Sequence, residues 1–242
     1  IDPSYFTTSP QYVLDNPEIN IVIEVMGGEN PAYDYIKQAI CKGKSVVTAN
    51  KEVIAKHGAE LVKLAEEHNV ALYYEASVGG GIPLIGPLKH DLLANNIASI
   101  YAIINGTTNY ILTKMAQENV NFDLALKEAQ ALGYAEADPT NDIEGTDAAY
   151  KLTILATLAF HTRVNFDDIY KEGISRLTAL DFRYAKELGF EIKLLAIAKR
   201  EGASIQARVH PTLIPDDLLL AKVDGVFNAL QIDGDMIGRM LF

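Results

Sequence analysis

An acidic segment at residues 133–151 is the part of this sequence whose residue types and spacing could do chemistry. It carries five carboxylates within twelve positions, Glu136, Asp138, Asp142, Glu144 and Asp147, and then a cation, Lys151. Helical, apolar-periodic sequence flanks it on both sides, so it is not a solvated tail. Carboxylates crowded together in a folded protein are typical of a site that holds a cation, an ammonium group or a proton in transfer.

Two interpretations of the end of this segment stay open. Asp147 and Lys151 are four residues apart, so they share one face if a helix has begun by Gly145. The structural alternative is an ordinary helix start, with Thr146 or Asp142 as its cap and an exposed ion pair at Asp147 and Lys151.

The elements before residue 76 alternate between short apolar strands and helices. We expect strands at 19–26, 44–48 and 71–75, and helices at 31–42 and 52–68, the second interrupted near Gly58. This alternation predicts a parallel, doubly wound α/β sheet. Ligands in such sheets bind beyond the carboxyl ends of the strands, where this sequence has Gly27-Gly28, Asn50-Lys51 and residues 75–81.

The rest of the chain predicts a mixed α+β domain. Helices are expected at 83–94, 107–117, 122–132 and 148–160 and a strand at 97–104. Further helical and strand patterns occupy 180–188, 191–199 and 204–209, with His210-Pro211 ending the last strand. Asn105-Gly106-Thr107-Thr108-Asn109 is a turn with a helix N-cap, which alone explains it.

Three consecutive glycines, Gly79 to Gly81, follow the third expected strand. Their backbone N–H groups could cradle a phosphate, but the glycines match neither the dinucleotide nor the P-loop spacing. The alternative interpretation is that the backbone here packs closely against a neighbour. Glycines can also turn carbonyls toward a hard cation, with Glu75 adding a carboxylate. Lys51 follows a strand end, where a lysine meets a phosphate, polarises a carbonyl or is merely solvated.

Composition excludes several classes of protein. A formal charge of −11 and the absence of a basic stripe argue against a nucleic-acid partner. No apolar run reaches bilayer length, and a single Cys41 fits a reducing compartment, so we expect a cytoplasmic protein without membrane partners. The chain begins without Met and stops inside an apolar run, which suggests a piece of something longer.

Several motifs, taken together, resemble homoserine dehydrogenases, and the single-function bacterial forms more than those fused to aspartokinase. The resemblance follows the family's order and spacing over essentially the whole chain. Its motifs are Val25-Met26-Gly27-Gly28, Thr48-Ala49-Asn50-Lys51, residues 75–83, residues 105–110 and the acidic segment.

The resemblance implies NAD(P)-dependent interconversion of L-homoserine and L-aspartate 4-semialdehyde, in threonine and methionine biosynthesis, by a homodimer. It implies a partial Rossmann-like nucleotide-binding half at 1–77, an α+β catalytic and dimerisation domain at 78–235, and the start of a return to the first domain at 236–242. The family's dinucleotide fingerprint is then expected before Ile1, and its returning segment after Phe242.

The same resemblance implies a role for each site residue. Lys151 and Lys51 match catalytic lysines, and Glu136 and Asp147 match residues that hold the substrate. Gly27, Gly28, Lys51 and Gly133 match cofactor-binding positions. Glu75 and the main-chain oxygens of Val78, Gly80 and Ile82 match the site of a monovalent cation, Na⁺ or K⁺.

Two other functions remain as alternatives. The chain could be a non-catalytic oligomerisation core of such an enzyme. It could also be a different, acylating semialdehyde dehydrogenase, which would need a cysteine nucleophile. Cys41 lies inside an expected helix, a poor position for a nucleophile.

Overall fold

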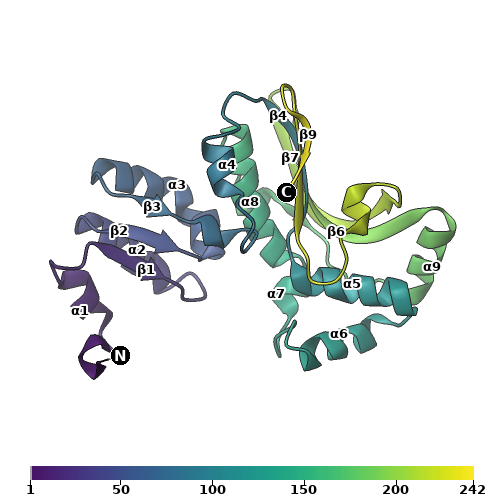
Figure 1. Ribbon diagram of the computed structural model, residues 1–242, viewed down its shortest axis with the longest axis horizontal. Coiled ribbons are helices and arrows are strands. Elements are labelled where there is room, and N and C mark those ends of the chain that lie inside the picture. Colours follow the sequence, from purple (N-terminus) through teal and green to yellow (C-terminus); the bar gives the residue numbers. More distant parts are fainter. Residues whose placement is uncertain (1) are drawn as a thin grey trace. The chain divides into compact units, whose positions relative to one another are not determined.

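Two compact units, Ile1–Gly86 and Pro87–Phe242, make up the chain in the computed structural model, which describes residues 2–242 (Figure 1). The division lies within the short helix α4 (Ile85–Lys89), a little after the boundary at 77/78 suggested by the sequence. Each unit has its own sheet, and the two are described separately.

The first unit is a three-stranded parallel sheet in the order β1-β2-β3, joined by helices. Its elements are α1 (Pro10–Asp15), β1 (Ile21–Glu24), α2 (Ala32–Cys41), β2 (Ser45–Thr48), α3 (Lys51–Glu67) and β3 (Leu72–Tyr73). Helices α2 and α3 each bury one apolar stripe, through Ile36 and Ile40 in α2 and through Val53 and Leu61 in α3. The parallel sheet predicted from the alternation of strands and helices is confirmed.

Two details of the first unit differ from the sequence prediction. Helix α3 is continuous, so the expected interruption at Gly58 is wrong. Gly58 is buried, and a Cβ there would lie 3.2 Å from Cγ2 of Ile54, so this glycine serves close packing inside the helix. Strand β3 is only two residues long, because Glu75 already belongs to a 3₁₀ turn, Glu75–Ser77.

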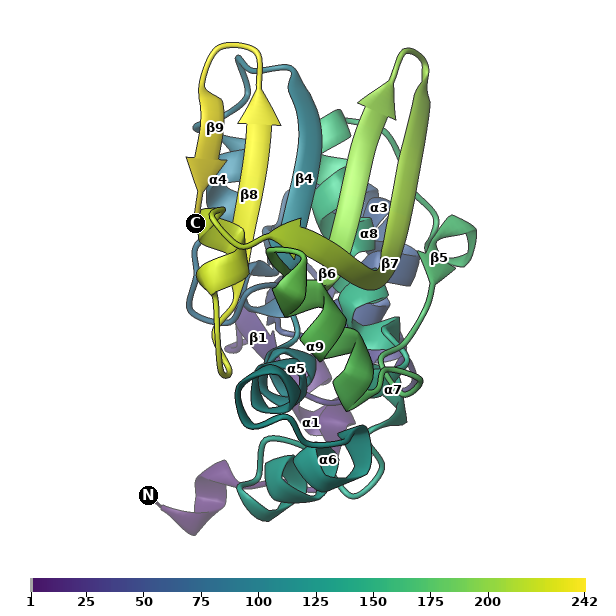
Figure 2. The same ribbon diagram turned by 90° about the vertical axis from the view of Figure 1, so that its right-hand side faces the viewer.

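The second unit is a mixed six-stranded sheet in the order β5-β7-β6-β4-β8-β9, seen face-on in Figure 2. Its strands are β4 (Ile97–Ile103), β5 (Tyr170–Lys171), β6 (Phe190–Glu201), β7 (Ser204–Pro215), β8 (Ala229–Gly234) and β9 (Gly238–Leu241). Its helices after α4 are α5 (Gly106–Glu118), α6 (Phe122–Ala131), α7 (Thr140–Ile143), α8 (Thr146–Phe160) and α9 (Ala179–Glu187). An α+β unit is what the sequence predicted.

The two faces of this sheet differ in their cover. Helix α8 packs on strands β4, β6 and β7 and lies behind the sheet in Figure 2, over a face of fully buried small and apolar residues such as Ile100, Ala102 and Ala196. The other face carries the alternate residues, and only one end is covered by the 3₁₀ turn Leu219–Lys222, which packs on Ile103 and Leu195.

Two predictions for the second unit are corrected. The helix expected over 83–94 is only α4, followed by turns. Strand β7 does not end at His210-Pro211 but runs on to Pro215, paired with β6 throughout. Pro211 is tolerated because β5 covers β7 only at Arg208 and Val209, so the far side of β7 is a sheet edge from His210 onward. None of the helices within residues 2–242 is long and apolar enough to cross a membrane.

Candidate active site

The turn between β4 and α5 is the centre of the candidate site in the second unit. Asn105 is 6% exposed and caps α5, with its Oδ1 accepting from the Thr108 backbone N–H at 2.8 Å and from the Thr108 hydroxyl at 2.9 Å. This is the N-cap that the Asn-Gly-Thr-Thr-Asn motif predicts. The cap fixes the direction in which the chain leaves the sheet.

Lys151 and Asp147 form an ion pair on the first turn of α8. Lys151 Nζ lies 2.7 Å from Asp147 Oδ2, and it also donates to the Ile104 carbonyl at 2.8 Å. The Asp147 residue is 2% exposed and the Lys151 side chain 16%. The predicted shared face is confirmed, whereas the ordinary exposed pair is wrong. Helix α8 begins after Gly145 in the left-handed conformation, with no side-chain cap from Thr146 or Asp142.

The Asn105 amide joins two carboxylates of the acidic segment. Its Nδ2 donates to Asp142 Oδ1 at 2.7 Å and to Asp147 Oδ2 at 2.8 Å. Both oxygens belong to residues far along the chain, so no local spacing could have indicated this contact. Oδ2 of Asp147 therefore accepts from Asn105 and Lys151 together.

The other three acids of the segment have separate surroundings. Asp138 accepts from the Thr140 hydroxyl and backbone N–H, and these hydrogen bonds lower the pKa of Asp138. Glu144 accepts from the Ser175 hydroxyl at 2.8 Å. The Glu136 carboxylate is exposed, and no hydrogen bond among residues 2–242 links it to Lys151; its backbone carbonyl accepts from Gln130. Gly133 is exposed, with φ of +78° after α6.

A loop at 223–227 holds the start of α5 from the other side. Asn109 Nδ2 donates to the carbonyls of Val223 and Phe227 at 3.0 and 3.1 Å. A Cβ on Gly106 would lie 2.8 Å from the Val226 carbonyl oxygen, so only glycine permits this close approach. The loop and the Asn105 turn therefore pack as one piece.

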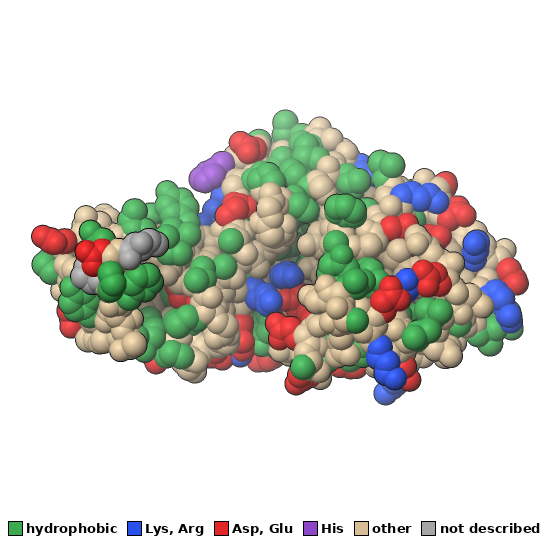
Figure 3. Space-filling view, turned by 60° about the horizontal axis from the view of Figure 1, so that its bottom comes forward, with side chains coloured by type: hydrophobic (Ala, Val, Ile, Leu, Met, Phe, Trp, Pro, Cys, Tyr) green, Lys and Arg blue, Asp and Glu red, His purple; other side chains and the backbone are tan. Residues whose placement is uncertain are grey.

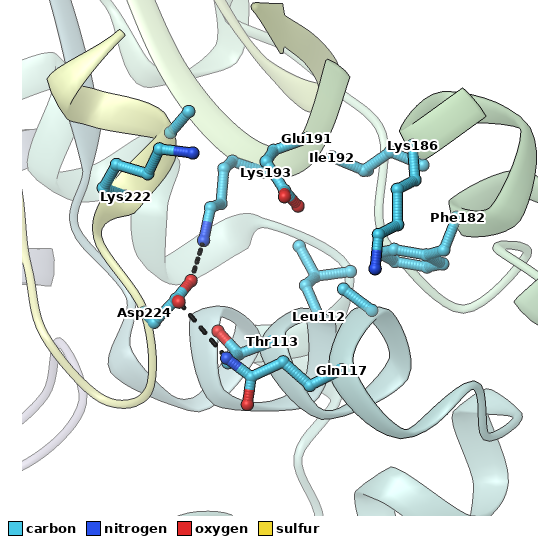
Figure 4. Close-up of a pocket in the computed structure, with 12 residues that line it drawn as sticks. Leu112, Thr113, Gln117, Phe182, Lys186, Glu191, Ile192, Lys193, Lys222 and Asp224 are labelled. Atoms are coloured by element: carbon cyan, nitrogen blue, oxygen red, sulfur yellow. Dashed lines mark hydrogen bonds and ion pairs between the residues drawn. The ribbon is translucent and has the colours of Figure 1, made fainter. Parts of the chain in front are cut away.

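Lys193 anchors the same loop from β6. This side chain is 2% exposed, and its Nζ donates to the Val223 carbonyl and to Asp224 Oδ1, both at 2.8 Å. Figure 4 shows the pair at one side of a cavity of about 170 Å³, with Gln117 donating to the other oxygen of Asp224. Glu191 and Asp224 offset most of the charge of the three lysines that line this cavity, which leaves it without a strong preference for one sign of ligand.

In the first unit, the predicted cofactor residues lie where β1 and β2 end. Asn50 caps α3 through Oδ1 and donates from Nδ2 to the carbonyls of Met26 and Gly28, at 3.3 and 2.8 Å. Gly28 has φ of +78°, and a Cβ on Gly27 or Gly28 would meet nothing within 4 Å. This leaves an open, side-chain-free backbone at the carboxyl end of the sheet, which fits a dinucleotide. Lys51 is the first residue of α3.

The glycine loop after β3 is held by Glu75. Oε1 of Glu75 accepts from the backbone N–H groups of Leu84 and Ile85, and Oε2 from that of Gly86, at 2.7 to 2.8 Å. Gly79 and Gly80 have φ of +77° and +60°, in the left-handed region. The neighbouring Tyr74 has its pKa raised to about 12, first by burial and then by the negative charge of Glu75.

The donor set of the predicted cation site is compatible with Na⁺ or K⁺, since it offers one carboxylate and backbone carbonyls. Hydrogen bonds inside the loop run through the Gly79 carbonyl, which accepts from the Ile82 N–H at 3.0 Å, and not through the predicted ligand carbonyls. Within residues 2–242, no three His, Cys, Asp or Glu side chains are grouped to hold a metal; the predicted set has only one such side chain.

Comparison with known proteins gives the same assignment for both units. Residues 3–75 match the family model "Homoserine dehydrogenase, NAD binding domain" and residues 83–242 match the model "Homoserine dehydrogenase". The chain is 50% identical to the homoserine dehydrogenase of Neisseria gonorrhoeae over 98% of its own length, and 51% identical to that of Pseudomonas aeruginosa over 95%. It covers 54% and 53% of those proteins, so it spans about half the length of these curated relatives.

Solved structures agree. A homoserine dehydrogenase from Thiobacillus denitrificans superimposes with a TM-score of 0.95 at 54% identity, covering 97% of this chain and 55% of that one. A hyperthermophilic archaeal homoserine dehydrogenase in complex with NADPH gives a TM-score of 0.84 at 33% identity, covering 98% of this chain and 68% of that one.

The first unit matches a model for the NAD-binding domain of a dehydrogenase, and the second unit matches the model for the rest of the same kind of protein, so the class to which both matches point is that of the NAD-binding dehydrogenases. Within that class, the chain belongs to the homoserine dehydrogenase family.

Proposed function

We propose that this chain carries the catalytic residues of a homoserine dehydrogenase, which interconverts L-homoserine and L-aspartate 4-semialdehyde with NAD or NADP in the cytoplasm. This reaction would serve threonine and methionine biosynthesis. The observation that carries the proposal is the Lys151–Asp147 pair, in which a partly buried lysine meets a buried carboxylate against the β4–α5 turn in a chain of this family.

Lys151 is the proposed acid and base. Reducing the aldehyde builds negative charge on its oxygen, which a positioned acid must neutralise by giving a proton. Two of the three N–H bonds of the Lys151 ammonium donate to Ile104 and Asp147, so the third is available for the substrate oxygen. In the reverse direction the Lys151 amine takes the proton of the homoserine hydroxyl.

Glu136 and Asp147 are the proposed partners of the substrate's ammonium group. The exposure of the Glu136 carboxylate supports a role in capturing a charged ligand, since no protein group among residues 2–242 bonds it. Asp147 already accepts from Lys151 and Asn105, so its main contribution is the local negative charge.

Nicotinamide cofactor and cation complete the proposal. The cofactor supplies or accepts the hydride; Gly27, Gly28, Lys51 and Gly133 would hold it. The one-carboxylate set at Glu75, with the carbonyls of Val78, Gly80 and Ile82, would hold Na⁺ or K⁺, and Glu75 would keep the loop closed through its three backbone hydrogen bonds.

A homodimer through the second unit is also proposed. Strands β4 and β6 carry apolar residues on both faces, but the face away from α8 is covered only at one end within residues 87–242. The uncovered part of this face includes the partly exposed Tyr101 and the exposed Leu241, and a second copy of the same sheet would cover them.

The function is tested by following nicotinamide absorbance while L-homoserine is oxidised, with L-serine as a control substrate one methylene shorter. The assay uses this chain and a form extended by the additional segments of the Neisseria gonorrhoeae relative. Reduction of the cofactor by homoserine, and far less by serine, is expected of the extended form. No reduction by either form would contradict the proposed reaction; turnover by the extended form alone would favour the non-catalytic-core alternative for these 242 residues.

A further inference from the structure

We infer that Asn105 is a positioning residue for the reaction: its side-chain amide fixes Asp147, and through it Lys151, by bridging two carboxylates. This inference rests on the proposed function of Lys151. The Asn105 side chain does two separate tasks: its Oδ1 caps α5, while its Nδ2 donates to Asp142 and Asp147.

The geometry leaves Asp147 little freedom. Oδ2 of Asp147 accepts from Asn105 at 2.8 Å and from Lys151 at 2.7 Å, and the residue is 2% exposed. A buried carboxylate with two donors on one oxygen has a defined rotamer, and removing one donor lets the carboxylate rotate. Lys151 then loses the fixed point that sets its position.

The same turn holds Lys151 a second time. The Ile104 carbonyl, next to Asn105 in sequence, accepts from Lys151 Nζ at 2.8 Å. A turn that carries both the acceptor of the lysine and the donor to its carboxylate fixes their relative placement. Asn105 also separates Asp142 from Asp147 by giving each a hydrogen of its amide, which offsets the repulsion between the two acids.

Serine at position 105 separates the two tasks. Ser caps helices about as well as Asn, but its hydroxyl cannot bridge two carboxylates while it accepts from Thr108. Asn105→Ser should therefore keep the cap and fold, although losing the donor to the buried Asp147 should lower its unfolding temperature. Below that temperature the substitution should lower kcat by about 10- to 100-fold, the loss expected when a reacting group is displaced by a fraction of an ångström to an ångström. Asn105→Asp keeps the cap and adds a third carboxylate, so its kcat should be lower still.

The test is a double-mutant cycle on the form of the enzyme that oxidises homoserine, using Asn105→Ser, Asp147→Asn and both together. If Asn105 acts through Asp147, Asn105→Ser should change kcat by less than about twofold in the Asp147→Asn background. Asn121→Ser is the matched control, because Asn121 is the N-cap residue of α6 with no side-chain hydrogen bond to the helix, and it should leave kcat unchanged.

Two results would overturn the inference: a wild-type kcat in both Asn105→Ser and Asn105→Asp, or the same fold loss from Asn105→Ser with and without Asp147. If the wild-type enzyme oxidises homoserine, either result overturns the role of Asn105 but not the proposed function. A wild type that does not oxidise homoserine refutes the proposed function first, and the inference with it.

Discussion

The Lys151–Asp147 pair differs from the other ion pairs of this chain in its surroundings. Lys114, for example, pairs with two exposed carboxylates, Glu118 and Glu128, and hydrogen bonds to them raise its pKa. Lys151 instead donates to one buried carboxylate and one backbone carbonyl. Pairs with exposed carboxylates contribute little to stability, whereas a lysine that donates to a buried carboxylate and to a backbone carbonyl is held in one place, as proton transfer requires.

Removing the Glu136 carboxylate should weaken substrate capture more than chemistry. Glu136→Ala is expected to raise the KM for homoserine by about tenfold, because the substrate's ammonium group would lose one charge-assisted hydrogen bond, while kcat changes much less. Steady-state kinetics with varied homoserine measure both parameters. Asp123→Ala, an exposed acid in the first turn of α6, is the control and should change neither. A fall in kcat at unchanged KM would place Glu136 in the chemical step instead.

Sequence reasoning found part of this site. The four-residue spacing of Asp147 and Lys151 predicted their contact because helix geometry alone decides it. The bridging role of Asn105 could not be predicted, since Asp142 and Asp147 reach it only once α7 and α8 have folded back onto the end of β4. The structure does not bring Glu136 to Lys151 by hydrogen bonds within residues 2–242, so its role stays a prediction.

At the scale of elements, the β4–α5 turn depends on the absence of a side chain at Gly106. Gly106→Ala places a Cβ 2.8 Å from the Val226 carbonyl oxygen, so the turn or the loop must shift. We expect a loss of about 1–3 kcal/mol in the free energy of unfolding, typical of overpacking, together with lower kcat. Thermal and urea unfolding measure the first. Gly81→Ala is the control for stability, because its Cβ meets nothing within 4 Å; equal effects of the two changes would contradict the close-approach argument.

The ion pair between Lys193 and Asp224 anchors the 223–227 loop, and its removal can be tested. Asp224→Asn leaves the buried Lys193 ammonium without its carboxylate, and should cost about 1–3 kcal/mol, moderated because the Asp224 side chain is 52% exposed and water can reach it. Lys193→Met fills the same space without a charge and should cost less. Urea unfolding of both variants, with the exposed Asp217→Asn as control, measures this order; the reverse order would show that the ammonium itself stabilises the loop.

Element predictions succeeded where the pattern was local and periodic. The alternation of strands and helices before residue 76 gave the parallel order β1-β2-β3, and the apolar pattern of 148–160 gave α8 to within a few residues. The failures at Gly58 and Pro211 share one cause: glycine and proline end elements only when neither packing nor a sheet edge accommodates them. Neither condition is visible in a local window of sequence.

For the molecule as a whole, the expected self-association and the expected lack of a nucleic-acid partner both stay predictions about its surface. On the face drawn in Figure 3, lysine and arginine side chains are scattered among acidic ones and form no continuous basic stripe. The open face of the second unit's sheet mixes charged residues such as Lys199 and Asp233 with Tyr101, whose ring lies 5.3 Å from Lys199 Nζ. Such a mixed face suits self-association.

We therefore expect a dimer, with an interface above about 1,000 Å², the size that separates biological from lattice contacts. Tyr101→Arg would set like charges against each other across a two-fold interface and should give monomers. Light scattering at micromolar concentration measures the mass. Lys127→Glu, on the exposed side of α6, should stay dimeric. A monomeric wild type would count against the dimer, and a dimeric Tyr101→Arg would place its interface elsewhere.

The most direct test of the central claim is the kcat of Lys151→Ala for homoserine oxidation, measured beside Lys114→Ala. Both substitutions remove a lysine from an i,i+4 ion pair on a helix, but only Lys151 is held at the β4–α5 turn. Losing a general acid–base group should lower kcat by about 10²- to 10⁴-fold for Lys151→Ala, with cofactor affinity much less affected. Lys114→Ala should turn over like the wild type. A Lys151→Ala enzyme that folds normally and keeps near-wild-type turnover would contradict the assignment of Lys151 as the acid and base.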